Sequence, residues 1–349
     1  MAKKKKKQLD DTFKTFEDLY KMENNETLYF IKPKEDIDSV DVELERLNTP
    51  FLSHHRYHGG GPAKRKITTF AGNYSCAKTS MCLAIAGANP EAKIGFLDGE
   101  FNWVDSSFIW ARDYFGIQPE NLLVTQATYL EEAAEALSAM MEVCDIVILD
   151  GYDALAPQSE FESENAQQHM GILARAYKKF FRKTAGKVYH TNSSFLITNH
   201  IYDNVGNSFE PQKEPGGKCI YDFPSQKFWH GRKTIKSADK TEVIGQGVTV
   251  TVKKDKLSGK MGQRYELPYY NGIGFDVEED IVNNAADLGV MVKSGSWYSL
   301  DGTNVAQGSV KAAQFLRDNP EIADDIWDKC MDIIKNTPEE IIEDNTKIV

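Results

Sequence analysis

The sequence lacks the marks of several protein classes. It has no apolar run of the roughly 20 residues that a membrane-spanning helix needs, and its basic start, MAKKKKKQLDD, leads into polar sequence instead of the apolar core of a secretory signal. Its five cysteines are scattered, with no C-x-x-C pair, which argues against a disulfide framework and a zinc site. We therefore expect a protein of the cytoplasm, in a reducing compartment and without membrane contact.

Net positive charge is also lacking. The 349 residues carry a formal net charge of −11, which argues against whole-surface binding to nucleic acid but leaves room for a local basic groove. Basic residues cluster at Lys3–Lys7, Lys178–Lys183 and Lys253–Lys260. The first cluster is typical of a solvated tail, whereas the other two adjoin segments with regular patterns.

The pattern along the chain predicts an α/β fold. After a short amphipathic helix at 10–23, which could pack on its own domain or on a neighbouring subunit, strand and helix patterns alternate from about 67 to 270. Such alternation favours a mostly parallel sheet covered by helices. VIGQGVTVTVKKDK and QRYELPYY read as antiparallel edge strands, and a small, helical C-terminal piece follows from about 277.

One segment resembles a phosphate-binding loop. GNYSCAKT at 72–79 follows the apolar strand pattern ITTFAG and precedes the helix pattern TSMCLAIAGA. In such loops, backbone N–H groups and a lysine bind phosphates, and the next hydroxyl binds Mg²⁺. Gly72, Lys78 and Thr79 occupy those places, so we interpret the loop as a working nucleotide site.

Ala77 departs from this motif, which usually has glycine there. A left-handed backbone at this position would cost alanine roughly 1 kcal/mol, whereas helical torsions would cost nothing. Because residue 77 adjoins the start of a helix, we expect helical torsions.

Two acidic residues end neighbouring strand patterns. Asp150 ends DIVILD and suits a carboxylate beside Mg²⁺, whereas Glu100 ends IGFLDGE and suits a group that orients an attacking water. Ligands bind at the carboxyl edge of a parallel sheet, so both side chains should converge on the loop.

These segments together resemble a known family. GNYSCAKT, FLDGE, VILDGYDAL, HMGILARAYKKFFRK, LITNH, VKKDK and the C-terminal DLGVMVKSGSWYSLDGTNVAQGSVKAAQFLRDNPEIADDI occur in the order seen in RecA-type recombinases, with the closest likeness to the phage UvsX branch. The match covers roughly 60–335. It implies a RecA-like core at 51–275, a small C-terminal α/β domain at 276–349, and an N-terminal segment at 1–50 that could dock subunits.

The resemblance implies an ATP- and Mg²⁺-dependent enzyme that forms a helical filament on single-stranded DNA and exchanges strands with homologous duplex DNA. Catalytic roles fall on Glu100, Lys78, His200, Lys254 and Lys256. His200 would sense the γ-phosphate, and the two later lysines would reach the ATP of a neighbouring subunit. ATP contacts fall on Gly72, Asn73, Tyr74, Ser75, Cys76, Ala77, Lys78, Thr79 and Ser80, with Asp105 and Phe108 at the adenine, and Mg²⁺ contacts on Thr79 and Asp150.

DNA contacts are implied in three segments. Residues 158–171 resemble a first DNA loop that ends near Met170, and residues 202–217 resemble a second one. Arg175, Lys178 and Arg182 share a helix face by their spacing of three, four and seven; a solvated face would show the same pattern. The expected contacts are Met170, Arg175, Lys178, Arg182, Phe209, Gly216 and Gly217.

Two other functions fit part of the pattern. An ATP-binding DNA filament protein with little turnover would not need Glu100. A helicase motor on the same core would not need the C-terminal piece. The resemblance also suggests a recombination mediator and a single-strand binding protein as partners.

Overall fold

The computed structural model describes residues 44–161, 169–204, 211–237 and 239–337. The chain divides into two units, Met1–Leu44 and Glu45–Val349. The helix expected at 10–23 lies outside the described residues. Within the described ranges, no helix is long and apolar enough to cross a membrane.

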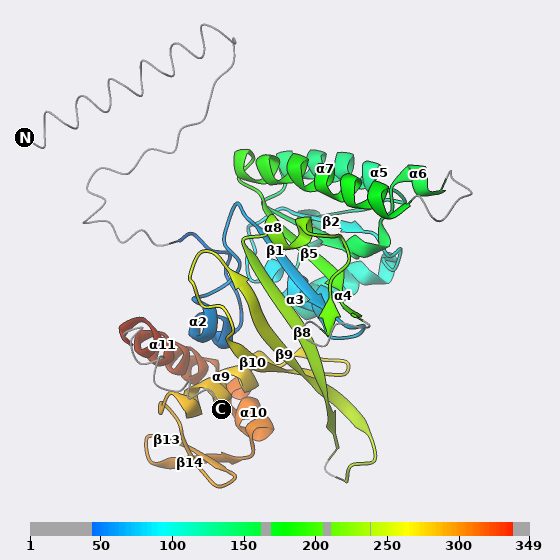
Figure 1. The fold of residues 1–349 in the computed structure, drawn as a ribbon. Helices are drawn as coiled ribbons and strands as arrows, with labels where there is room; N and C mark the ends of the chain where they lie inside the picture. Colours follow the sequence, from blue (N-terminus) through cyan, green and yellow to red (C-terminus); the bar gives the residue numbers. More distant parts are fainter. Residues whose placement is uncertain (1–43, 162–168, 205–210, 238, 338–349) are drawn as a thin grey trace, which may run out of the picture. The chain divides into compact units, whose positions relative to one another are not determined.

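A single large sheet forms the centre of the second unit (Figure 1). Within the described residues it has nine strands in the order β11-β10-β9-β8-β1-β5-β4-β2-β3. Neighbours from β3 to β8 run parallel, and β9, β10 and β11 continue the sheet antiparallel. The strands are β1 (Ile67–Gly72), β2 (Ile94–Asp98), β3 (Leu122–Gln126), β4 (Ile146–Asp150), β5 (Ser194–His200), β8 (Gln226–Lys236), β9 (Val243–Asp255), β10 (Arg264–Tyr270) and β11 (Gly274–Phe275).

This topology confirms the expected α/β class and the antiparallel pairing, but β9 and β10 are not edge strands, because each has a neighbour on both sides. The sheet also contains β8, which we did not predict. The first half of β8 is largely buried and the second half exposed, and His230 and Arg232 interrupt its apolar residues. The strand nevertheless pairs with β1 on one side and with β9 on the other. Only its neighbours in the sheet make this mixed sequence a strand.

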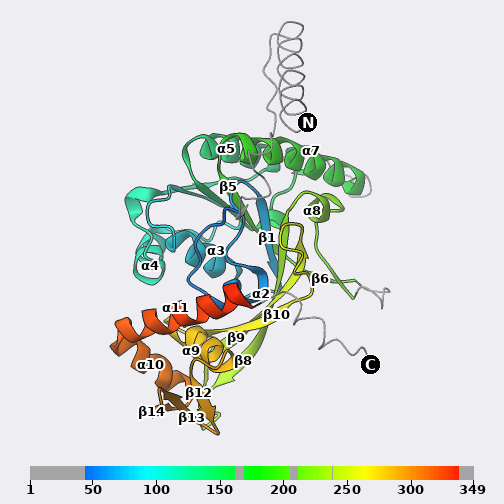
Figure 2. The same ribbon diagram turned by 90° about the vertical axis from the view of Figure 1, so that its left-hand side faces the viewer.

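Helices cover both faces of the sheet, as Figures 1 and 2 show. Along β4, Ile146 and Ile148 join one apolar core and Val147 and Leu149 the other, because successive side chains of a strand point to opposite faces. Burial of both faces explains why the strand is apolar throughout. The helices are α2 (Leu52–His58), α3 (Lys78–Gly87), α4 (Asp105–Phe115), α5 (Leu130–Val143), α6 (Gln158–Phe161), α7 (His169–His190) and α8 (Cys219–Asp222), with short 3-10 turns η1 (Pro119–Asn121) and η2 (Tyr152–Ala154).

The C-terminal piece has a core of its own. It contains α9 (Val277–Asp287), β12 (Val292–Ser294), β13 (Trp297–Leu300), β14 (Thr303–Gln307), α10 (Ser309–Asp318) and α11 (Pro320–Asn336), packed around Leu52 of α2 and residues such as Val282 and Leu316. The Asp276 side chain caps α9 by accepting from Glu279 N–H at 2.9 Å. The piece is thus α/β, because the segment that we read as helical also forms three strands within the described residues.

Candidate functional site

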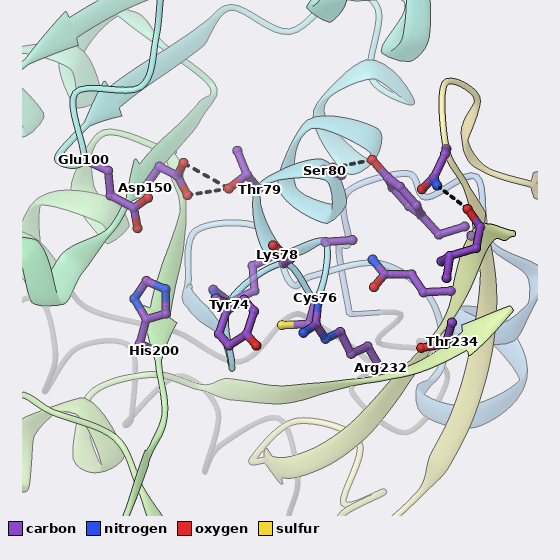
Figure 3. Close-up of a pocket in the computed structure, with 17 residues that line it drawn as sticks. Tyr74, Cys76, Lys78, Thr79, Ser80, Glu100, Asp150, His200, Arg232 and Thr234 are labelled. Carbon is purple, nitrogen blue, oxygen red and sulfur yellow. Dashed lines mark hydrogen bonds between the residues drawn. The ribbon is translucent and has the colours of Figure 1, made fainter.

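Residues 72–79 form a tight loop between β1 and α3 (Figure 3). A Cβ on Gly72 would lie 2.5 Å from Cys76 Sγ and 2.5 Å from the His230 carbonyl oxygen, closer than any side chain tolerates. The Cys76 thiol donates to the Asn73 carbonyl at 2.9 Å. Gly72 is therefore required by close packing between the loop and β8.

Ala77 corrects our expectation. Its torsions are φ 58° and ψ 34°, in the left-handed region, so the expectation of helical torsions was wrong. Residue 77 is the N-cap of α3, a position outside the helix proper, and Ser75 also has a positive φ of 54°. Left-handed residues in such a loop turn successive N–H groups toward one concave side, where an anion binds. Alanine therefore accepts a strain of roughly 1 kcal/mol.

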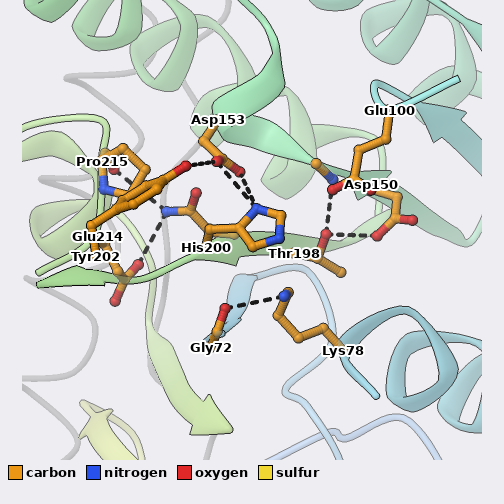
Figure 4. Close-up of polar contacts among 12 residues, drawn as sticks. Gly72, Lys78, Glu100, Asp150, Asp153, Thr198, His200, Tyr202, Glu214 and Pro215 are labelled. Atoms are coloured by element: carbon orange, nitrogen blue, oxygen red, sulfur yellow. Dashed lines mark hydrogen bonds and ion pairs between the residues drawn. The ribbon is translucent and has the colours of Figure 1, made fainter. Parts of the chain in front are cut away.

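Polar contacts join the end of the loop to Asp150 of β4 (Figure 3), and Asp150 to Thr198 of β5 (Figure 4). Lys78 Nζ donates to the carbonyls of Gly72 at 3.1 Å and Asn73 at 3.0 Å. Asp150 Oδ1 accepts from the hydroxyls of Thr79 at 2.8 Å and Thr198 at 2.6 Å.

The surroundings of Asp150 disfavour the ionised form of its carboxylate. Burial raises the pKa of Asp150 to about 6 against the opposing effect of its two hydroxyl donors, and the nearby acidic groups Glu100 and Asp98 raise it further. A hydroxyl and a carboxylate are the hard oxygen ligands that Mg²⁺ prefers. The residues present fit this ion.

Glu100 lies in the same cavity, in a turn that Asp98 holds. The buried Asp98 carboxylate accepts from the N–H groups of Glu100 at 3.0 Å and Trp103 at 2.7 Å. The Glu100 carboxylate accepts from the Asn102 amide at 3.0 Å. Glu100 and Asp150 thus converge on the loop, as expected, and Asp98 is a positioning residue that the strand pattern did not distinguish.

These groups line one polar cavity of about 630 Å³. Opposite the loop, its side is built by β8, β9, β10 and the turn after β10, which we call the β8–β10 wall. Its residues are Arg232, Thr234, Val243, Gly245, Gln246, Tyr269 and Asn271. In that wall, the Tyr269 hydroxyl lies 3.4 Å from Ser80 Oγ, and the Arg232 guanidinium lies over the Tyr74 ring at 4.5 Å.

Asp105 and Phe108 do not line this cavity, and their role at the adenine stays a prediction. Asp105 is an exposed residue at the start of α4, and Phe108 packs edge-on against Trp103 with ring centroids 5.5 Å apart. Besides Tyr74 of the loop, the fold brings the ring of Tyr269 to the cavity. No local signal in the sequence marks it, because only strand pairing carries β10 there.

His200, at the end of β5, also lines the cavity. Its Nδ1 lies 3.1 and 3.2 Å from the two oxygens of Asp153. The ring is partly exposed, which favours a role toward the cavity over a purely structural one.

Lys254 and Lys256 lie away from this cavity. Both ammonium groups donate to the Asp222 carbonyl, at 3.1 and 3.3 Å, and Lys254 also donates to Tyr221, so both satisfy carbonyls at the end of α8. Burial and the neighbouring Lys256 lower the pKa of Lys254 to about 8. Their role toward the ATP of a neighbouring subunit stays a prediction.

The basic residues of α7 lie together on its exposed side. Arg175, Lys178 and Arg182, with Lys179 and Lys183, line a shallow hollow of about 300 Å³. The helical spacing was therefore predicted correctly, and DNA binding on this face remains a hypothesis. The side chain of Met170 and the whole of Phe209 lie outside the described residues.

The second expected DNA loop begins and ends as a small hairpin, in which β6 (Tyr202–Asp203) pairs antiparallel with β7 (Gln212–Lys213). Gly216 and Gly217 follow with positive φ values of 101° and 65°. A Cβ on Gly216 would lie 2.8 Å from the Tyr152 ring, so close packing as well as conformation requires glycine there.

Glu214, which sequence reasoning missed, ties this loop to the sheet. Its buried carboxylate accepts from Lys227 at 2.9 Å, from the Trp229 indole at 2.6 Å and from the Asn199 amide at 3.3 Å. Asn199 precedes His200 on β5. A buried ion pair on β8 thus anchors the loop beside the nucleotide cavity.

Comparison with known proteins agrees with this geometry. Family models for the RecA N-terminal domain and the RecA C-terminal domain match residues 35–274 and 279–335. The chain is 31% identical to Protein RecA of Acidothermus cellulolyticus over 77% of this chain and 78% of that protein. It is 31% identical to Protein RecA of Thermus thermophilus (78% and 80%) and 30% identical to that of Aquifex pyrophilus (84% and 84%). With the phosphate loop, the two converging carboxylates and the C-terminal domain all in place, the chain belongs to the RecA family of ATP-dependent DNA recombinases.

Proposed function

We propose that this chain hydrolyses ATP in the cavity between the phosphate loop and the β8–β10 wall, and that its ATP-bound form assembles as a helical filament on single-stranded DNA. The filament then pairs with homologous duplex DNA and exchanges strands. The observation that carries this proposal is the convergence of Lys78, Thr79, Asp150 and Glu100 in one cavity. A cation for the phosphates, a hydroxyl and a carboxylate for the metal, and a second carboxylate for the attacking water form the set that phosphoryl transfer to water requires.

Each group has a distinct task. Lys78 and the loop N–H groups bind the terminal phosphates, and Thr79 and Asp150 would hold Mg²⁺. Bound Mg²⁺ supplies charge neutralisation at the phosphates. Glu100 accepts a hydrogen bond from the attacking water and orients it toward phosphorus. Tyr269 offers a ring face to the base.

DNA binding is assigned to the face of α7 and to the loop that follows β5. The cationic side chains of α7 suit a phosphate backbone, and the backbone of Gly216 and Gly217 allows close approach of a phosphate. Lys254 and Lys256 would act on the ATP of the neighbouring subunit, so that hydrolysis depends on assembly.

The first experiment measures ATP hydrolysis with and without single-stranded DNA, for wild type and Glu100→Gln. We expect DNA-stimulated turnover that Glu100→Gln abolishes while ATP binding persists. Glu91→Gln, an exposed glutamate just before β2, is the matched control and should hydrolyse ATP as wild type does.

Two outcomes would point elsewhere. Tight ATP binding without turnover in wild type would indicate a DNA filament protein with a binding-only site. DNA-stimulated turnover with duplex unwinding but no pairing of homologous strands would indicate a helicase motor.

We further propose an origin in the UvsX-like branch and a place in the cytoplasm of a bacterium or a phage-infected cell. The pairing assay should be stimulated by a single-strand binding protein together with a recombination mediator. The proposed division is 1–50, 51–275 and 276–349, for docking, catalysis and the accessory domain.

A further inference from the structure

A buried carboxylate outside the phosphate-binding groups contacts His200. Asp153 belongs to η2, directly after the strand that ends at Asp150. Its side chain is 8% exposed and that of His200 28%. Both Asp153 oxygens lie within 3.2 Å of His200 Nδ1, and Figure 4 shows the other ring nitrogen turned away from Asp153, toward the side where Lys78 and Asp150 lie.

This contact decides which ring nitrogen carries a proton. An ionised carboxylate only accepts hydrogen bonds, so Nδ1 must carry a proton. In a neutral ring, Nε2 would then bear a lone pair and would repel a phosphate oxygen. Nε2 donates only when the ring is an imidazolium. A His200 that binds a γ-phosphate while it contacts Asp153 is therefore a cation.

The same carboxylate reaches the second DNA loop. The Tyr202 hydroxyl donates to Asp153 Oδ2 at 2.7 Å, and Tyr202 is the first residue of β6, paired with Lys213 of β7. Burial and this contact raise the pKa of Tyr202 to about 12, so its hydroxyl stays a donor throughout the range of a histidine titration. One carboxylate thus joins the cavity side of β5 to the base of the hairpin.

We propose that Asp153 is the positioning residue that holds His200 as an imidazolium toward the γ-phosphate and couples that contact to the second DNA loop through Tyr202. This inference rests on the proposed nucleotide site. The charged and titratable groups around the ring are Asp153 from η2, Tyr202 from β6 and, across the cavity, Lys78, Glu100, Asp150 and Arg232.

The test is a pH profile of nucleotide-dependent DNA affinity. The dissociation constant of the full chain for a fluorescent oligothymidine is measured from pH 6 to 8.5, with a non-hydrolysable ATP analogue and with ADP, and the ratio of the two constants is the readout. A histidine changes charge within about pH 5 to 8. In wild type, the advantage of the ATP analogue should shrink as pH rises, by up to tenfold per pH unit once the ring is mostly neutral.

Three variants separate positioning from simple structural support. His200→Gln should keep an ATP advantage that does not change with pH, because an amide donates at every pH. Asp153→Asn should lose about tenfold of the advantage at pH 7 and shift the decline to lower pH. Asp328→Asn, at an exposed aspartate on α11, should match wild type.

Several results would overturn the inference. If the ATP advantage of wild type stayed constant from pH 6 to 8.5, the inference would be wrong while the proposed function would stand. The same holds if the pH profile of Asp153→Asn were identical to that of wild type. An unfolded Asp153→Asn would leave the contrast between wild type and His200→Gln to decide. No ATP advantage in wild type at any pH would remove both the inference and the proposed function.

Discussion

The two sides of the nucleotide cavity are built in different ways. The phosphate side is built mainly from the consecutive residues 74–80, and Thr79 among them contacts Asp150 at the end of β4. The β8–β10 wall gathers residues between Arg232 and Asn271 from three antiparallel strands. The first side offers main-chain N–H groups, the Lys78 ammonium and the Thr79 hydroxyl for phosphate and metal, whereas the second offers the Tyr269 ring and the long side chains of Arg232 and Gln246.

This difference indicates which contacts tolerate change. Phosphate chemistry needs charge and N–H groups at fixed places, so one altered side chain on that side should remove activity. The wall supplies contact area and shape, so a substitution there should lower activity only in part. Four measurements would sharpen or break this contrast.

The largest effect is expected on the phosphate side. Lys78→Ala removes the cation at the loop and should lower ATP turnover by about a hundredfold or more. Lys93→Ala, at an exposed lysine beside β2, is the control in the same assay. Normal turnover in Lys78→Ala would show that the loop was wrongly assigned.

Acid should destabilise the β8–β10 wall, because the buried His58 packs against residues of β8 and β10. His58 lies between Tyr265, whose hydroxyl is 3.0 Å from its Nε2, and Phe228, with ring centroids 4.8 Å apart. Burial, with a smaller effect of Arg46, lowers the pKa of His58 to about 3. The folded state therefore disfavours the proton, so this contribution to stability is complete above about pH 6.5 and is lost as the pH falls toward 3.

At pH 5 this loss amounts to about 2 kcal/mol for His58 alone. Denaturant unfolding of wild type and His58→Gln at pH 7.5 and pH 5 measures it, and the fall in unfolding free energy should be smaller by that amount in the variant. The unfolding free energy of His190→Gln, a change at an exposed histidine, should fall by as much as that of wild type. Equal falls in all three proteins would exclude His58 as the acid-sensitive group.

A substitution in the wall itself should weaken ATP binding moderately. Tyr269→Ala removes the ring face and should raise the KM for ATP about tenfold with little change in kcat, since an aromatic stack on a base contributes about 1–3 kcal/mol. Tyr269→Phe keeps the ring and should stay near wild type. A drop in kcat with an unchanged KM would show that the wall takes part in the chemistry and is not only a binding surface.

The smallest effect concerns the backbone of the loop. Ala77→Gly relieves the left-handed strain and should raise the unfolding free energy by up to about 1 kcal/mol, with ATP turnover retained. The matched change Ala84→Gly lies inside α3 and should lower it by about the same amount. Destabilisation by both changes would mean that Ala77 is not strained.

Most of the phosphate side was predictable. Gly72, Lys78, Thr79, Asp150 and Glu100 stand at strand ends or in a motif of fixed spacing, and a parallel sheet brings such ends together. The torsions of Ala77 were not predictable in this way, because the residue before a helix follows the path of its loop and not the helix that comes next.

The wall and the contacts of His200 were not predictable in the same manner. Tyr269 reaches the cavity only because β10 pairs with β9 and β9 with β8. Asp153 meets His200, and Glu214 meets Lys227, from distant parts of the sequence or across a chain reversal.

The pattern of residues along the chain was enough for the α/β alternation, the phosphate loop and the basic face of α7, because each depends on neighbours within one or two turns or on strand order. The strand character of β8, the aromatic ring at the cavity and the partner of His200 were decided by tertiary packing. A mixed strand or a lone carboxylate has no role until pairing and burial place it, and the energies of pairing and burial depend on residues that lie far away in the sequence.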